Sequence, residues 1–241
     1  MTQGALIVFE GSEGVGKTTQ ARRLVDVLQH CGVRCAHLRE PGGTSLGEAI
    51  RNVLLEPFRT IAPSAEALLF MASRAQLVTE RIQPTLAADE VVVLDRFFLS
   101  TYAYQIHGRG LPSDRVRAAN QLAAGGLVPT VTIVLHLPNN EGLARAGKRS
   151  SHDYMEQLGD DFHSRVGQAF EEFVTPAWQA AHSECGPIVS VDASGSADCV
   201  FERIVHALAP HTPQLNAALT AAVTAAVTAA LAGALAQEAV R

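Results

Sequence analysis

Residues Gly11–Thr18 read Gly-Ser-Glu-Gly-Val-Gly-Lys-Thr, and this stretch decides the predicted fold. It matches G-x-x-x-x-G-K-[ST] without a mismatch, it follows the apolar run Ala5–Phe9, and a helix is predicted from about Gly16 to Gln29. Glycines allow backbone N–H groups to curl around an anion, and the following helix presents its positive end to the same anion. The stretch therefore predicts a P-loop, a phosphate-binding loop between a strand and a helix.

The rest of the chain alternates between predicted strands and helices. Further apolar runs predict strands at 33–38, 91–94, 131–137 and 188–191, and helices are predicted at 46–55 and 64–82. This alternation is typical of an α/β fold, a five-stranded parallel sheet with helices on both faces. Since ligands bind beyond the carboxyl ends of such strands, we expect the chemistry just after Phe9, Leu38, Leu94 and Leu137.

Composition limits the class of protein. A chain of 241 residues suits one domain of roughly 200 residues plus an appendage, and 47% hydrophobic residues suffice for a core. The net charge of -5 argues against a general nucleic-acid binder. No basic flank or cleavage site accompanies the apolar run at Ala5, so the cytoplasm is the expected compartment. No zinc spacing is complete, which predicts free thiols at Cys31, Cys35, Cys185 and Cys199.

The motif assigns the donor nucleotide, ATP, to one continuous segment. Lys17 is placed to reach the β- and γ-phosphates, and the Thr18 hydroxyl is placed to bind Mg²⁺. Of 19 basic residues, only Lys17 and Lys148 are lysines, and the other 17 are arginines. A lysine in the P-loop of such a chain suggests that the compact ammonium group fits there better than the planar guanidinium group of arginine. The predicted ATP-binding residues are Gly11, Ser12, Glu13, Gly14, Val15, Gly16, Lys17, Thr18 and Thr19.

Asp95 and Arg96 follow the buried run 91–94. An acid beside an arginine suits Mg²⁺ together with an acceptor phosphate, and the alternative is a surface ion pair. No Asn-Lys-x-Asp motif of a GTPase is present in the sequence, and the strand end lacks the longer acidic run of a motor ATPase. These features favour a kinase.

Three motifs, in order at the ends of three successive predicted strands, resemble signatures of the thymidylate kinase family. They are Phe9–Gln20, Arg39–Thr44 and Asp95–Gln105, within a resemblance that covers about residues 4 to 208. The resemblance implies a P-loop kinase fold and transfer of the γ-phosphoryl group of ATP to dTMP, giving dTDP and ADP for dTTP synthesis. It also implies a homodimer, with no nucleic-acid or membrane partner.

The same resemblance implies roles in holding the phosphate and sugar of dTMP. Glu13 would contact the 3′-hydroxyl and take part in catalysis with Lys17. Arg96 would hold the dTMP phosphate, and Arg51 and Pro41 would line the acceptor site, with Arg51 facing that phosphate. Tyr104 would crowd the 2′ position of the sugar and reject ribonucleotides.

Four further residues are implied at the base. Phe70 would stack on thymine, Arg74 would donate to a base carbonyl, and Ser100 and Gln105 would lie near the base. Phe70 and Arg74 are one helical turn apart, so they face the same way. The alternative for Phe70 is ordinary core packing.

Residues 139–155 contain Arg145, Lys148 and Arg149 but few apolar residues, which predicts a basic lid. In the bacterial type of the family the P-loop has no arginine between its acid and its lysine, and the lid supplies one. Glu13–Lys17 indeed contains none, so Arg149 is the first candidate for the catalytic arginine and Arg145 the second. Tyr154 stands where that type commonly carries another arginine. The alternative is a solvated loop.

A composition change near 210 divides the chain into a kinase domain, 1–210, and an Ala-rich tail, 211–241. Apolar side chains recur every four residues there, which predicts a helical extension that packs on the kinase body or on a partner. The alternatives are a disordered tail and, by length alone, a membrane-associated segment. The recurring apolar side chains are Leu215, Leu219, Val223, Val227, Leu231 and Leu235.

Two other functions remain alternatives. One is a kinase for another small acceptor, such as a deoxynucleoside or shikimate. The other is a non-catalytic nucleotide-binding module whose working part is the tail. The pair Arg96 and Arg51 favours an acceptor that already carries a phosphate.

Overall fold

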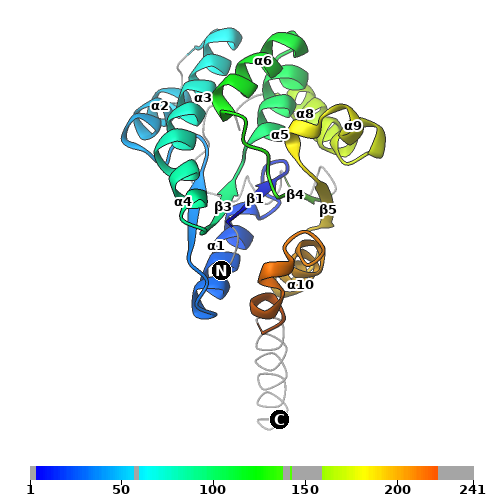
Figure 1. The fold of residues 1–241 in the computed structure, drawn as a ribbon. Coiled ribbons are helices and arrows are strands. Elements are labelled where there is room, and N and C mark those ends of the chain that lie inside the picture. Colours follow the sequence, from blue (N-terminus) through cyan, green and yellow to red (C-terminus); the bar gives the residue numbers. More distant parts are fainter. Residues whose placement is uncertain (1–3, 57–59, 138–141, 143–158, 222–241) are drawn as a thin grey trace.

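A computed structural model describes residues 4–56, 60–137, 142 and 159–221. Its centre is a parallel sheet in the order β2-β3-β1-β4-β5, between two layers of helices (Figure 1). The strands are β1 Ala5–Glu10, β2 Cys35–Arg39, β3 Val91–Asp95, β4 Val131–His136 and β5 Ile188–Asp192. The predicted five-stranded parallel sheet with flanking helices is confirmed.

The central strands are apolar throughout because both of their faces are covered. On β1, Leu6 and Val8 belong to one buried hydrophobic cluster, whereas Ile7 and Phe9 belong to the other. This alternation follows from the two-residue period of a strand. The P-loop therefore follows directly after a strand that is packed on both faces.

The helices follow the predicted order. They are α1 Lys17–His30, α2 Ser45–Leu55, α3 Pro63–Leu77, α4 Gln83–Ala87, α5 Phe98–Thr101, α6 Ser113–Ala124, α8 Asp160–Phe173, α9 Pro176–Ala181 and α10 Ala197–Leu208. The described residues also form two π-helical segments, η1 Val78–Ile82 and η2 Tyr102–Gly108, and two 3₁₀ turns, η3 Ser183–Cys185 and η4 Pro213–Leu215. Helices α1 and α10 cover one face of the sheet, and α3, α5, α6 and α8 lie over the other (Figure 1).

The predicted helix at 64–82 is longer than expected. It was predicted to end before Pro84, but η1 follows α3 directly and Pro84 lies in the first turn of α4. Because proline has no N–H and its ring crowds the carbonyl group one turn earlier, a regular α-helix is disfavoured at Pro84, and the π-helical segment η1 lies just before it.

The described start of the C-terminal segment packs on the rest of the domain. Leu215 and Leu219 are fully buried in the hydrophobic cluster that contains Leu24 of α1 and Ile204 of α10. The division into 1–210 and 211–241 stays a prediction, since residues 222–241 lie outside the described residues. No helix in the described ranges is long and apolar enough to cross a membrane. All four cysteines are free thiols, as predicted.

Candidate active site

A cavity of about 480 Å³ opens beyond the carboxyl ends of β1, β2 and β3. From the donor segment it is lined by Glu13, Gly14, Gly16, Lys17, Thr18 and Thr19, but not by Gly11, Ser12 or Val15. Its lining also includes Asp95 and every residue predicted for the acceptor: Glu13, Pro41, Arg51, Phe70, Arg74, Arg96, Ser100, Tyr104 and Gln105. The fold thus brings the two predicted substrate sites into one space, although the role of each residue stays a prediction.

The P-loop takes its shape from its glycines. Gly11 has φ 134°, and a Cβ atom there would lie 2.3 Å from the carbonyl oxygen of Leu135, so only glycine fits. Gly16, with φ 95°, precedes α1, and no side chain caps that helix. The first N–H groups of α1 are thereby left for an anion.

Lys17 is buried and folded back onto the P-loop. Its Nζ donates to the carbonyl oxygens of Gly11 at 2.9 Å and Ser12 at 2.6 Å. Burial, reinforced by the nearby charge of Arg96, lowers the pKa of Lys17 to about 7. A bound polyphosphate would favour the ammonium form and offer it stronger acceptors than two carbonyl groups.

Thr18 and Asp95 meet at the end of β3. The Thr18 hydroxyl donates to Oδ2 of Asp95 at 2.5 Å. The other carboxylate oxygen, Oδ1, is buried and has no hydrogen-bond partner within the described residues. A buried carboxylate oxygen beside a hydroxyl oxygen is a donor set that suits a hard cation.

Arg96 follows β3 in a left-handed conformation, with φ 71°, which is uncommon for a residue other than glycine. Its backbone N–H donates to the carbonyl oxygen of Phe9 at 2.9 Å, and this bond ties the turn to β1. Its Nη1 donates to the Ser100 hydroxyl at 3.0 Å, and its guanidinium lies 5.2 Å from the centre of the Tyr104 ring. Burial opposes its charge, yet Tyr104 and Glu13 help to raise the pKa of Arg96 above its ordinary value.

Glu13 connects the P-loop to η2. Its Oε1 accepts from the Tyr104 hydroxyl at 2.5 Å and lies 3.6 Å from Nη2 of Arg96. Its Oε2 lies 3.7 Å from Nδ1 of His163, at the start of α8. Burial raises the pKa of Glu13, but Arg96, Lys17 and the Tyr104 hydroxyl outweigh it, so the pKa lies below its ordinary value.

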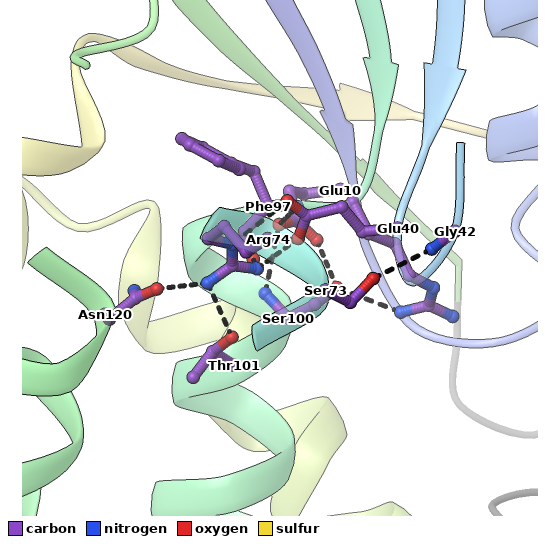
Figure 2. Close-up of polar contacts among 10 residues, drawn as sticks. Glu10, Glu40, Gly42, Ser73, Arg74, Phe97, Ser100, Thr101 and Asn120 are labelled. Carbon is purple, nitrogen blue, oxygen red and sulfur yellow. Dashed lines mark hydrogen bonds and ion pairs between the residues drawn. The ribbon is translucent and has the colours of Figure 1, made fainter. Parts of the chain in front are cut away.

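Arg74 is the centre of a buried network at the other end of the cavity (Figure 2). Its Nε and Nη2 donate to the carboxylate of Glu40, and its Nη1 donates to Asn120 and, at 3.0 Å, to the Thr101 hydroxyl. Its Nη2 also donates to the carbonyl oxygen of Phe97 at 2.8 Å. All five N–H groups of the guanidinium thus have protein partners. The prediction that Arg74 donates to a base carbonyl therefore requires one of these bonds to be shared.

Glu10 is a residue that the sequence analysis did not single out. It is fully buried at the end of β1, and its Oε1 accepts from the backbone N–H groups of Phe97 at 2.7 Å and Ser100 at 3.0 Å. Its Oε2 accepts from the Ser100 hydroxyl at 2.6 Å. An acidic residue that ends an apolar strand was the available signal. Glu10 thus holds Phe97 and Ser100 in place (Figure 2), in the segment from which Arg96 and Ser100 line the cavity.

The predicted lid cations lie outside the described residues. Arg145, Lys148 and Arg149 fall within 143–158, so nothing in the geometry bears on them. Phe70 is half-buried and lines the cavity, which leaves part of its ring accessible to a ligand.

The P-loop opens into the same cavity as Arg51, Arg96 and Phe70. This arrangement is typical of a P-loop phosphotransferase whose acceptor carries an aromatic ring and a phosphate. The chain belongs to the thymidylate kinase family, whose sequence model matches residues 9–204.

Individual relatives agree with that assignment. The chain is 46% identical over 213 residues to a thymidylate kinase of Synechococcus sp. (strain JA-2-3B'a(2-13)), which covers 88% of this chain and 97% of the relative. It is 42% identical over 198 residues to the thymidylate kinase of Deinococcus radiodurans, across 82% of this chain and 93% of the relative. The crystal structure of thymidylate kinase from Ehrlichia chaffeensis superposes with a TM-score of 0.66 and 26% identity, covering 85% of this chain and 98% of that one.

Proposed function

We propose that this protein is a dTMP kinase, which transfers the γ-phosphoryl group of ATP to dTMP and releases dTDP and ADP. The observation that carries the proposal is the single cavity in which the P-loop faces Arg96, Arg51 and Phe70. Phosphoryl transfer needs little covalent chemistry from a protein, but it needs two anionic groups to be held in line while water is kept out. The cavity supplies cationic and N–H groups for both.

Each side chain has a distinct task in this proposal. Lys17 and the first turn of α1 hold the transferring phosphoryl group of ATP, and Arg96 and Arg51 hold the phosphate of dTMP. Glu13 accepts a hydrogen bond from the 3′-hydroxyl of the sugar, and Tyr104, held by its hydrogen bond to Glu13, closes the space at the 2′ carbon. The accessible side of Phe70 stacks on the base.

Mg²⁺ is the metal that the donor set fits. Thr18 and Asp95 offer a hydroxyl oxygen and a buried carboxylate oxygen without a partner in the described part of the chain. Mg²⁺ commonly takes one or two protein ligands and completes its shell with waters and phosphate oxygens, so no larger cluster of acids is needed. When bound, the metal neutralises charge on the β- and γ-phosphates.

Arg149 remains the first candidate for an arginine that acts on the transferring phosphate, with Arg145 second. Arg149→Ala should lower kcat far more than it raises the KM for dTMP if the residue acts mainly in the transition state. A higher KM for dTMP with an unchanged kcat would mean that the residue only positions substrate.

A coupled assay of ADP release tests the proposal directly. The acceptors should include dTMP, dUMP, UMP, dCMP, thymidine and shikimate, each with and without excess EDTA. ADP release that depends on Mg²⁺ and is stimulated most by dTMP supports the proposal. Stimulation by thymidine or shikimate instead would favour a kinase for an unphosphorylated acceptor, and no stimulation by any acceptor would favour a nucleotide-binding module.

We also propose a cytoplasmic homodimer. Leu68 on α3 is 63% exposed and Leu122 on α6 is 85% exposed, on two helices that pack against each other. Exposed leucines on neighbouring helices suit burial against a second copy of the chain. Light scattering on the purified protein should give twice the chain mass, and Leu122→Glu should reduce it to one chain mass.

A further inference from the structure

The side-chain amide of Gln105 lines the cavity, and a buried residue on its far side fixes its orientation. Gln105, on η2, lines the cavity, and its Nε2 donates to Oε1 of Glu66 at 3.0 Å. Glu66 lies in the first turn of α3 and is 1% exposed. Its carboxylate also accepts from Arg109, at 3.2 Å between Nε and Oε1 and at 2.6 Å between Nη2 and Oε2. The amide of Gln105 is therefore held by a buried ion pair.

The chemistry of the ion pair decides which end of the amide faces the ligand. A carboxylate accepts hydrogen bonds and has none to donate, so the NH₂ group of Gln105 must point toward Glu66. The carbonyl oxygen, Oε1, then lies on the opposite side of the amide. Within the described residues, no hydrogen-bond donor contacts this oxygen. It is also not one of the fully buried side-chain atoms that lack a partner, so it is accessible from the cavity. Oε1 is thus an acceptor left to the cavity.

This acceptor lies near the aromatic ring that faces the same cavity. Glu66 and Phe70 are four residues apart on α3, so their side chains project from the same face of the helix. Gln105, which Glu66 holds, and Phe70 both line the cavity. A flat base stacked on that ring would direct its edge toward the polar groups beside it.

We propose that Glu66 and Arg109 are positioning residues that hold Gln105 as a hydrogen-bond acceptor and thereby select a pyrimidine with a ring N–H. This inference rests on the proposed function. Thymine and uracil carry a hydrogen on N3, whereas cytosine has a lone pair there, which would face the oxygen of Gln105 without a shared proton. A site that is built to hydrogen-bond one group rejects an analogue lacking it by up to about 10⁴–10⁵, and we expect at least about a hundredfold here.

The test measures kcat/KM for dTMP and for dCMP in the wild type and in Glu66→Leu. Leucine offers no acceptor, so the amide of Gln105 would be free to rotate and to present its NH₂ group to N3 of cytosine. The ratio of kcat/KM for dTMP over dCMP should fall at least about tenfold, mainly through a higher KM for dTMP and a lower one for dCMP. A folded Glu66→Leu enzyme with the wild-type ratio would overturn the proposal.

Glu184→Leu is the matched control. Glu184 is also paired with an arginine, at 2.9 Å from Arg117, and it accepts from Tyr102 of the same π-helical segment at 3.0 Å. The hydrogen bonds of its carboxylate go to these two side chains and not to Gln105. Glu184→Leu should lose comparable stability and keep the dTMP preference, and an equal fall in the ratio would overturn the proposal, because selectivity would then follow general loosening.

Gln105→Leu keeps the proposal testable if Glu66→Leu does not fold. Removing the acceptor should reduce the same ratio at least as much, and an unchanged ratio would overturn the proposal. Failure of the proposed function is a separate result, namely a wild type without dTMP turnover. In that case the dissociation constants of dTMP and dCMP, measured by calorimetry on the same variants, still decide whether Gln105 reads a ring N–H.

Discussion

The two ends of the cavity are built in different ways. The proposed donor end depends mainly on one continuous segment, Gly11–Thr18, which offers backbone N–H groups and a single lysine to the phosphates. The acceptor end is assembled from distant parts of the chain. Arg74 is 34 residues from Glu40 and 46 residues from Asn120, and all three belong to one buried network (Figure 2).

The difference predicts how each end responds to substitution. A site made of backbone groups keeps its shape when one side chain is removed, since the glycines and the strand define it. A site made of buried polar pairs does not, because removal of one partner leaves the other charged and without compensation. Variants at the donor end should therefore lose activity without stability, and variants in the network should lose stability as well.

Lys17→Ala should give the largest loss of turnover. The phosphate contact is removed at the point where charge develops, so kcat should fall at least about 10³-fold in the coupled assay. The melting temperature should stay the same or rise, because burial lowers the pKa of Lys17 to about 7, which means that the fold disfavours the ammonium. Arg22→Ala, at an exposed position of α1, is the control and should change neither quantity. A Lys17→Ala protein that melts far below the wild type would break the comparison.

Glu40→Gln should give a large loss of stability. It removes the charge that Arg74 pairs with in a fully buried setting, at a cost of about 3–5 kcal/mol in the free energy of unfolding, measured with urea. Glu90→Gln breaks a pair with Arg34 whose side chain is 70% exposed, and it should cost less than about 1 kcal/mol. The double variant Glu40→Leu/Arg74→Leu should be more stable than Glu40→Leu alone, because no charge is then left unpaired. Equal costs for Glu40→Gln and Glu90→Gln would contradict the proposed dependence on buried pairs.

The same difference explains what could be predicted from the sequence. The parallel sheet followed from apolar runs, and the P-loop followed from a short motif, because both depend on residues that are neighbours along the chain. The residues of the acceptor site were indicated by the resemblance to the thymidylate kinase family, and the structure brings their side chains to one cavity. The partners behind them were missed. Nothing near Asn120 in the sequence indicates that it contacts Arg74, and Glu66 shows its link to Gln105 only when α3 lies beside η2.

Tyr104 tests a contact that joins the two ends. Its hydroxyl donates to Glu13 of the P-loop, and its ring lines the acceptor side. The wild type should prefer dUMP to UMP, a pair that differs only at the 2′ position, and Tyr104→Ala should reduce that preference about 10-fold. Tyr104→Phe keeps the ring and should retain most of the preference. A wild type that uses UMP and dUMP equally well would show that Tyr104 does not exclude the 2′-hydroxyl.

Changes in the C-terminal segment should have the smallest effect on turnover. They test whether the donor end depends only on the residues of the P-loop. Leu215 and Leu219 are buried against α1 and α10, on the side of the sheet away from α3, and neither lines the cavity. Deletion of residues 222–241 should leave kcat and the melting temperature within error, because the described packing stays intact. Leu219→Ala should cost about 2–5 kcal/mol of stability, as for other buried leucines, while the folded fraction keeps the wild-type kcat. If either change lowers kcat in protein that circular dichroism shows to be folded, α1 transmits the state of its far end to the P-loop. The donor end would then depend on a network as the acceptor end does.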